Sequence, residues 1–232
     1  MPLIPDLRQA RRVLCVQPHY DDNDIGAGGT IAQWSAQGRK VVLVVCTNGD
    51  KGTSDRCITS EELVEIRQKE QRKAAEVLGI AEVAFLGYPD QGLEDSVEFR
   101  ESLVRQIRTR RPETVMTIDP NRKYIRHRDH HNAGRVTLDA VFPYARDHLA
   151  YPEHLREGLE PHKVAEVWIM DQDNADQYVD VTDYIEIAIA ALQSHVSQVG
   201  EDVAKHMRNW RSKTGKNAGF AYAEGFKRFR LG

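Results

Sequence analysis

Short apolar segments alternate with amphipathic segments of helical period along most of the chain, and this alternation constrains the fold more than any other feature. The apolar segments predict strands at residues 13–17, 40–46, 82–86, 114–118 and 165–170. The amphipathic segments predict helices at residues 26–37, 59–78, 97–110, 129–141 and 182–198. Strands that alternate with helices form a mainly parallel sheet with right-handed crossovers. The predicted fold is therefore α/β, a Rossmann-like three-layer αβα sandwich with a mainly parallel sheet.

The chain is long enough for one domain of this kind, and no low-complexity linker or internal repeat divides it. A single domain is predicted over residues 1–232, with residues 200–232 as a C-terminal extension made of a helix and a strap. Residues 143–163 include three prolines and are predicted to form a long irregular loop. We expect this loop and the C-terminal extension, which is rich in aromatic residues, to form walls of a substrate-binding pocket.

The composition argues against several kinds of partner and location. The net charge is −3, so nothing favours nucleic acid or an anionic membrane surface. No apolar run approaches the length of a membrane span, and residues 1–12 lack the sustained apolar core of a secretory signal. The three cysteines have no ligand-like spacing, which fits a reducing compartment. We therefore expect a cytoplasmic location.

The loop after the first predicted strand is rich in acidic side chains. After His19 come Asp21, Asp22 and Asp24, followed by a glycine-rich helix start at residues 26–29. In a dinucleotide-binding loop the phosphate lies at this helix start, where backbone N–H groups favour anions. Three carboxylates at the same place would repel phosphate and attract a cation. The glycines therefore predict a tight turn and close helix–strand approach, and the carboxylates predict a metal.

A second group, His127, Asp129 and His130, follows the fourth predicted strand. Since the carboxyl ends of parallel strands meet at one edge of a sheet, we expect the two groups to converge. His127 and His130 are three residues apart near a helix start, so they share a face. Imidazole and carboxylate together suit zinc, which in catalytic sites has three protein ligands and a water. The two loops together can supply three such ligands.

Other polar residues allow more than one interpretation. Asp50 and Asp90 follow the second and third predicted strands and join the same edge, but Asp50 also suits a simple turn after Gly49. Arg67 lies on the long second helix, and its spacing alone indicates a solvated charge. Histidines outside the strand-end groups, such as His195, are predicted to be non-catalytic.

Five short segments, taken together, have the pattern of a known family. They read Pro-His-Tyr-Asp-Asp-Asn at residues 18–23, Thr-Asn-Gly-Asp-Lys-Gly at 47–52, Ile-Arg-Gln-Lys-Glu at 66–70, Leu-Gly-Tyr-Pro-Asp at 86–90 and His-Arg-Asp-His at 127–130. This pattern resembles the PIG-L/LmbE family of zinc-dependent N-deacetylases. The family signatures are Ala-His-Pro-Asp-Asp-Glu before a glycine-rich helix start, and His-Pro-Asp-His. The resemblance extends over residues 12–200.

The resemblance implies a role for each matching residue. The metal ligands that it implies are His19, Asp22 and His130. Asp21 corresponds to the general base that activates a water molecule. His127 corresponds to the residue that stabilises the oxyanion or protonates the leaving amine, and Asp129 to a carboxylate that orients a histidine. The substrate-binding residues that it implies are Arg67, Asp90 and Asp50.

The implied activity is a metal-dependent hydrolysis. It removes the N-acetyl group of an N-acetylglucosamine-type sugar or glycoconjugate and releases acetate and a free amine. The implied cofactor is Zn²⁺, with another divalent metal such as Fe²⁺ as the alternative. The implied partner is a small N-acetylated sugar, and the resemblance also admits a homo-oligomer.

Two other functions remain open on the sequence. A phosphoesterase-like metal hydrolase would use the same acidic loop, but it needs cationic phosphate clamps beyond Lys51, Arg67 and Arg128. A non-catalytic sugar- or nucleotide-binding module would bind no metal. The chain also departs from the family signatures: Tyr20 and Arg128 replace prolines, and Asn23 replaces a glutamate. None of these departures removes an implied ligand or the implied base.

Overall fold

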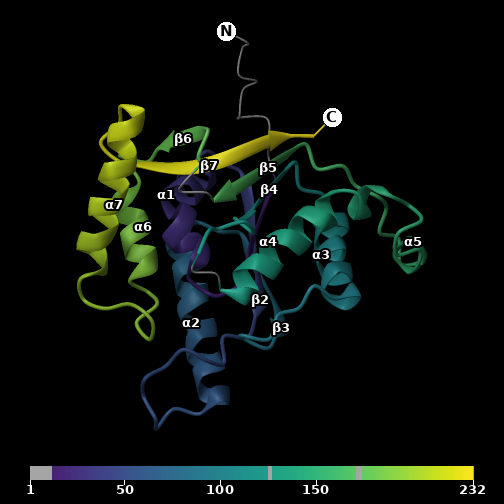
Figure 1. Cartoon of the computed structure of the whole chain (residues 1–232), viewed down its shortest axis with the longest axis horizontal. Coiled ribbons are helices and arrows are strands. Elements are labelled where there is room, and N and C mark those ends of the chain that lie inside the picture. The colour runs from purple at the N-terminus through teal and green to yellow at the C-terminus, as the bar shows by residue number, and fades with distance from the viewer. Residues whose placement is uncertain (1–11, 125–126, 171–173, 232) are drawn as a thin grey trace.

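The computed structural model describes residues 12–124, 127–170 and 174–231, and it shows a central sheet between two layers of helices (Figure 1). The N-terminal segment considered above lies, except for Arg12, outside the described residues. The strands are β1 (Arg12–Gln17), β2 (Lys40–Thr47), β3 (Glu82–Tyr88), β4 (Thr114–Ile118), β5 (Glu166–Met170), β6 (Gln177–Asp180) and β7 (Ala223–Arg230). The α-helices are α1 (Asp22–Ala36), α2 (Ser60–Leu78), α3 (Val97–Arg110), α4 (Arg128–Val141), α5 (Glu153–Arg156), α6 (Ile185–Leu192) and α7 (Val203–Ala218).

The order of the strands places a crevice beside β1. The sheet runs β3-β2-β1-β4-β5-β7-β6, and strands β1 to β5 are parallel. From β1 the chain adds β2 and β3 on one side and then returns to add β4 and β5 on the other. At such a reversal the loops after the two central strands diverge and leave a crevice. The acidic loop follows β1 and the histidine group follows β4, so both lie at this crevice.

Alternate side chains of the strands face two separate apolar cores. On one face, Leu14 packs with Phe99 of α3 and Val136 of α4. On the other face, Val13 packs with Trp34 of α1, where α2 and α6 also contribute. Figure 1 shows these helices as layers on opposite sides of the sheet. Burial on both faces explains why the parallel strands are nearly continuous apolar runs.

The first two helices begin at polar signals. Helix α1 begins at Asp22 rather than at residue 26, because acidic side chains are favourable in the first turn of a helix. Its backbone leaves the helical region at Ala27 (φ −148°, ψ 15°), which kinks the helix. At the start of helix α2, Thr59 and Glu62 form a capping box. The Thr59 hydroxyl accepts from the Glu62 N–H at 3.2 Å, and the Thr59 N–H donates to Glu62 Oε2 at 2.9 Å.

The C-terminal third differs most from the prediction. The helix expected at residues 182–198 is confined to α6, whose N-cap residue is Tyr184. Thr182 lies before this helix, and its hydroxyl donates to Asp180 Oδ1 at 2.6 Å. The expected strap is strand β7, which pairs antiparallel with both β5 and β6. Strand β6 was not predicted. None of the helices in the described ranges is both long and apolar enough to cross a membrane.

The irregular segment 143–163 packs along α3. Arg108 of α3 donates to backbone carbonyls of this segment, including those of Asp147 at 2.7 Å and Ala150 at 2.9 Å. His154 lies 2.5 Å from Glu101 Oε1, also on α3. The segment follows the end of α4, whereas the histidine group lies at the start of α4. These contacts therefore hold the segment against α3 and not over the crevice, contrary to the expectation that it walls the pocket.

Candidate active site

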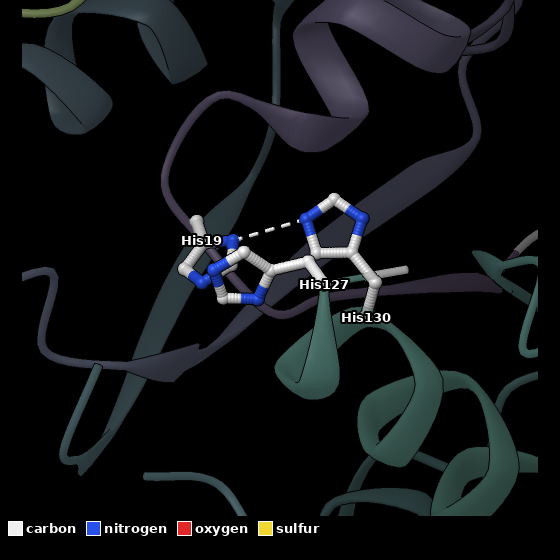
Figure 2. A group of neighbouring side chains, drawn as sticks. All are labelled: His19, His127 and His130. Atoms are coloured by element: carbon white, nitrogen blue, oxygen red, sulfur yellow. Dashed lines mark hydrogen bonds between the residues drawn. The ribbon is translucent and has the colours of Figure 1, made fainter. Parts of the chain in front are cut away.

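The two sequence groups converge at the crevice, as predicted. Figure 2 shows the rings of His19, His127 and His130 close together, His19 from the loop after β1 and the others from the start of α4. The ring centres of His19 and His127 lie 4.6 Å apart, and those of His19 and His130 lie 5.0 Å apart. Ligand atoms of the three histidines all lie within 4.8 Å of one another. The same limit holds for His19, His127, Asp90 and Asp129.

One edge of the His19 ring forms a triangle of three ligand groups with the His130 ring and the Asp22 carboxylate. His19 Nδ1 lies 3.1 Å from His130 Nε2. The Asp22 carboxylate reaches both rings, with Oδ2 3.3 Å from His19 Nδ1 and Oδ1 3.2 Å from His130 Nε2. Ligand atoms of a tetrahedral zinc ion, bonded at 2.0–2.1 Å, lie about 3.3 Å apart. The spacing of the three groups therefore fits a metal.

The other edge of the His19 ring faces two further carboxylates. His19 Nε2 lies 3.2 Å from Asp129 Oδ2 and 3.2 Å from Asp90 Oδ1. Asp129 is fully buried and accepts from the backbone N–H groups of Gln91 at 2.7 Å and Leu93 at 3.1 Å. Those two bonds fix the carboxylate, and the carboxylate in turn fixes the ring. A metal-ligating histidine commonly has a carboxylate on its second nitrogen.

The ionisation of the cluster favours a positive charge at its centre. Burial lowers the pKa of His19, but hydrogen bonds to the surrounding carboxylates outweigh it and raise the pKa well above the ordinary value. Burial raises the pKa of Asp22, but His130 and His19 outweigh it and hold the pKa low. Burial lowers the pKa of His130 and keeps that ring neutral, the form that binds metals. Either a proton or a divalent cation can balance the carboxylates here.

Asp21 lies beside the triangle without belonging to it. Its side chain is 20% exposed, and its Oδ1 is 3.9 Å from Arg67 Nη2. Burial, followed by the charge of Asp22, raises the pKa of Asp21 above its usual value. A partly accessible carboxylate of raised pKa next to a candidate metal site is suited to accept a proton.

Arg67 is buried beneath the site and is not the solvated charge that its spacing indicated. Only 4% of the residue is exposed. Its Nη1 donates to the carbonyl of Gly49 at 3.3 Å and to that of Lys51 at 3.2 Å. The same atom lies 3.7 Å from Asp90 Oδ2. Arg67 lies one helical turn after the buried Leu63, so the helical period of α2 was the signal that could have placed it inside.

Asp50 and His127 line the opening of the site. Asp50 Oδ1 accepts from the Asp90 N–H at 3.2 Å and lies 3.0 Å from Lys51 Nζ, so Asp50 does more than turn the chain. His127 is exposed, and its Nδ1 accepts from the Asp129 N–H at 3.2 Å as the cap of α4. Because Nδ1 accepts, the neutral ring carries its proton on Nε2. That N–H is then free to donate to a ligand.

Two buried features had no assigned role in the sequence. Tyr20 is fully buried, and the Arg67 guanidinium carbon lies 5.2 Å from its ring centre. Tyr20 stands where the family signature has a proline, and this departure was the signal in the sequence that could have identified it. His195, at the end of α6, lies with Nε2 3.5 Å from Asp24 Oδ2, and both residues are buried. No local pattern links those two residues, because they are far apart along the chain.

The chain was compared with known protein families. A model of the PIG-L family, described as GlcNAc-PI de-N-acetylase, matches residues 14–141 and so covers more than half of the chain. The chain belongs to this family. The match runs from β1 to the end of α4 and therefore includes both loops of the candidate site. The family and the His/Asp group together make this chain a metal-dependent hydrolase of N-acetyl groups.

Individual relatives agree with this placement. A diacetylchitobiose deacetylase of Thermococcus kodakarensis is 34% identical over 94% of this chain and 82% of its own length. A 1D-myo-inositol 2-acetamido-2-deoxy-alpha-D-glucopyranoside deacetylase of Catenulispora acidiphila is 35% identical over 62% of this chain and 52% of its own length. The structure of N,N'-diacetylchitobiose deacetylase from Pyrococcus horikoshii has a TM-score of 0.91 at 32% identity, covering 96% of this chain and 85% of that one.

A more distant structural neighbour is similar in fold alone. The 4-carboxy-2-hydroxymuconate hydratase of Pseudomonas putida has a TM-score of 0.81 at 22% identity, over 96% of this chain and 97% of that one. Two different reactions are thus named among proteins of this architecture. The reaction has to be argued from the side chains at the crevice.

Proposed function

We propose that this protein removes the acetyl group from a terminal N-acetylglucosamine unit of a small glycoside, using a zinc ion held by His19, Asp22 and His130. The observation that carries this proposal is the close approach of His19 Nδ1, His130 Nε2 and the two oxygens of the Asp22 carboxylate, with separations of 3.1–3.3 Å. The names of the two relatives support the substrate class, because diacetylchitobiose and the acetamido-glucopyranoside both contain a 2-acetamido sugar.

The two edges of the His19 ring indicate which set of residues holds the metal. Asp129 faces Nε2 and already accepts two backbone hydrogen bonds, so it is suited to hold the His19 ring in place rather than to bind the metal. Nδ1 lies 3.1 Å from His130 Nε2 and 3.3 Å from Asp22 Oδ2, so these three groups are close enough to share one metal ion. A zinc ion, or another divalent cation such as Fe²⁺, would there polarise the acetyl carbonyl and lower the pKa of a water molecule to about 7.

The side chains around that position divide the remaining chemistry. Asp21 accepts the proton of the attacking water, and such general base catalysis typically contributes about 10²–10⁴-fold. The His127 Nε2–H donates to the carbonyl oxygen as negative charge develops there. Asp21, which then carries the proton taken from the water, passes it to the departing nitrogen. Acetate and a free amino sugar are the products.

Arg67, Asp90 and Asp50, the implied substrate residues, differ in their access to a sugar. Arg67 and Asp90 are 4% and 6% exposed, so they support the site from below, with Arg67 aligning the carboxylates of Asp21 and Asp90. Asp50 keeps 20% of its side chain exposed and is the better placed of the three to accept from a sugar hydroxyl. Lys51 and Arg128 each pair with an acidic side chain, which weakens the case for a phosphate clamp.

Two substitutions separate metal binding from proton transfer. Asp21→Asn should keep the bound metal while kcat for acetate release from N,N'-diacetylchitobiose falls about 10²–10⁴-fold. His130→Ala should lose the metal, as measured by elemental analysis of the purified protein. His148→Ala, at a side chain that is 69% exposed, is the matched control and should change neither measurement.

The same panel tests the other functions. Release of phosphate from p-nitrophenyl phosphate without release of acetate from acetamido sugars would identify a phosphoesterase. Wild-type protein that binds the sugar but contains no metal would identify a binding module. Full acetate release by Asp21→Asn would show that Asp21 is not the base.

We also propose that the whole chain acts as one cytoplasmic domain. Strand β7 of the C-terminal extension lies inside the sheet, between β5 and β6, which supports a single folding unit. Cys15 and Cys46 are buried free thiols and Cys57 is an exposed one, as suits a reducing compartment. Cell fractionation tests the location, and light scattering distinguishes a monomer from the homo-oligomer that the family resemblance admits.

A further inference from the structure

A buried ion pair from the C-terminal extension lies at the kink of α1. Glu224, on β7, accepts from the Gly29 N–H at 2.9 Å and from the Thr30 N–H at 2.8 Å. Arg211, on α7, donates through Nη2 to the carbonyl of Ile25. In a regular helix the Gly29 N–H would donate to the Ile25 carbonyl. The N–H and the carbonyl that would form this helical bond are thus both bound by residues of the C-terminal extension.

The pair is isolated from solvent and its members depend on each other. Arg211 is 2% exposed and Glu224 is fully buried, and Arg211 Nε lies 3.6 Å from Glu224 Oε1. Breaking a buried pair by removing one partner leaves an uncompensated charge and is strongly destabilising. The pair is therefore costly to disturb, and its two groups keep fixed positions relative to α1.

The kink gives Glu224 a helix start to bind. Beyond Ala27, α1 resumes, and the N–H groups of its next turn lie at the positive end of the helix dipole, the arrangement that binds phosphate in other α/β proteins. Here a carboxylate of the same chain takes that place. Gly29 also lets Val181, which directly follows β6, pack against α1, because a Cβ at residue 29 would lie 2.7 Å from Val181 Cβ.

The pair thereby separates the first turn of α1 from the rest of the helix. That turn begins with Asp21 and Asp22 and ends at the kink. At its start, the His19 N–H donates to Asp22 Oδ2 at 2.9 Å and the Ile25 N–H donates to the Asp21 carbonyl at 2.9 Å. At its end, Arg211 binds the Ile25 carbonyl. The direction of the turn sets where both carboxylates point.

We propose that Arg211 and Glu224 are positioning residues that orient the first turn of α1 so that Asp22 meets His130 and Asp21 faces the substrate. This inference rests on the proposed roles of Asp21 and Asp22. It gives the C-terminal extension a part in metal binding although it supplies no ligand.

Glu224→Gln is the first test, because it keeps the size of the side chain and removes its charge. We expect zinc affinity, measured by chelator competition, to weaken at least tenfold, since supporting partners of metal ligands typically contribute about 10–100-fold. The kcat for acetate release should fall at least tenfold, with KM changing less than threefold. Arg211→Met should act in the same direction.

The matched control is Arg228→Met. Arg228 also lies on β7 and forms a largely buried ion pair, but its guanidinium contacts Glu166 and Trp168 of β5. All variants are compared well below their Tm, with folding verified by circular dichroism. Arg228→Met should lower Tm while leaving zinc affinity and kcat within twofold of wild type.

Hydrogen exchange of the metal-free protein supplies a measurement that does not depend on the proposed metal. Glu224→Gln should speed exchange of the Gly29 and Thr30 amides and of the first turn of α1, and Arg228→Met should not. If Glu224→Gln speeds that exchange but leaves zinc affinity and kcat within twofold, the positioning role is wrong and the pair is structural. If wild type itself binds no zinc, the proposed function fails first and the inference fails with it.

Discussion

At the scale of single residues, Tyr20 shows how a departure from the family signature is accommodated. Its ring is fully buried, lies 5.6 Å from the ring of Phe85, and supports Arg67 at 5.2 Å. Its hydroxyl donates to the Asn48 carbonyl at 3.0 Å. The ring also limits residue 49, where a Cβ would lie 2.6 Å from Tyr20 Cε2. The Tyr20 ring thus packs where the family has a proline, and Gly49 in the neighbouring loop leaves space for that ring.

This packing predicts that Gly49→Ala is more harmful than an alanine at another left-handed glycine. Gly49 has φ +63° and Gly38 has φ +81°, but of the two only Gly49 has side chains within 4 Å of the place that an added Cβ would take. Gly38→Ala should cost about 1–2 kcal/mol of unfolding free energy, the usual cost of this backbone region. Gly49→Ala should cost at least about 1 kcal/mol more, by overpacking, and should also lower kcat by displacing Arg67. Equal urea midpoints for the two variants would contradict the prediction.

At the scale of elements, local patterns were sufficient where an element is defined by its own sequence. The apolar run of β4 and the Ser96 cap of α3 mark those elements within their own residues. Strand β7 could not be identified in this way, because it is a strand only through pairing with β5 and β6. Strand β6 is short and only partly buried, so it lacks the apolar signal. In the site, the convergence of the two His/Asp groups followed from the strand ends, whereas the contacts of Arg67, Arg211 and Glu224 depend on packing between distant segments.

The contact of His195, in the segment after α6, with Asp24 of α1 predicts a pH-dependent stability. Burial lowers the pKa of His195, but Asp24, Asp21 and Glu70 outweigh it and raise the pKa. A raised pKa means that the stabilisation is fully present below the unfolded value of about 6.5 and is lost as pH rises through the folded value. The unfolding free energy of wild type relative to His195→Gln should therefore be largest near pH 6 and shrink toward pH 9. Exposed His148→Gln should show no such trend, and a constant difference for His195→Gln would refute the charge on His195.

At the scale of the whole molecule, the site joins the two halves of the sheet. His19 and Asp22 come from the loop after β1, which continues into β2 and β3, and His130 comes from the loop after β4, which continues into β5. The C-terminal extension contacts α1, the helix that carries Asp22, through Arg211 and Glu224 at the kink of that helix. The site is therefore assembled only when the complete sheet is formed, although its residues are far apart along the chain.

Metal should consequently stabilise the entire fold. At a free zinc concentration about 100 times Kd, binding adds about 2.7 kcal/mol to the unfolding free energy. For a domain of this size each kcal/mol raises Tm by about 2–4 °C, so Tm should rise by roughly 5–11 °C and fall again with a chelator. His130→Ala should show no rise, because the ligand from the second loop is missing, whereas His148→Ala should respond like wild type. An equal rise in the Tm of His130→Ala would show that the stabilising metal binds elsewhere and that its binding does not require both loops.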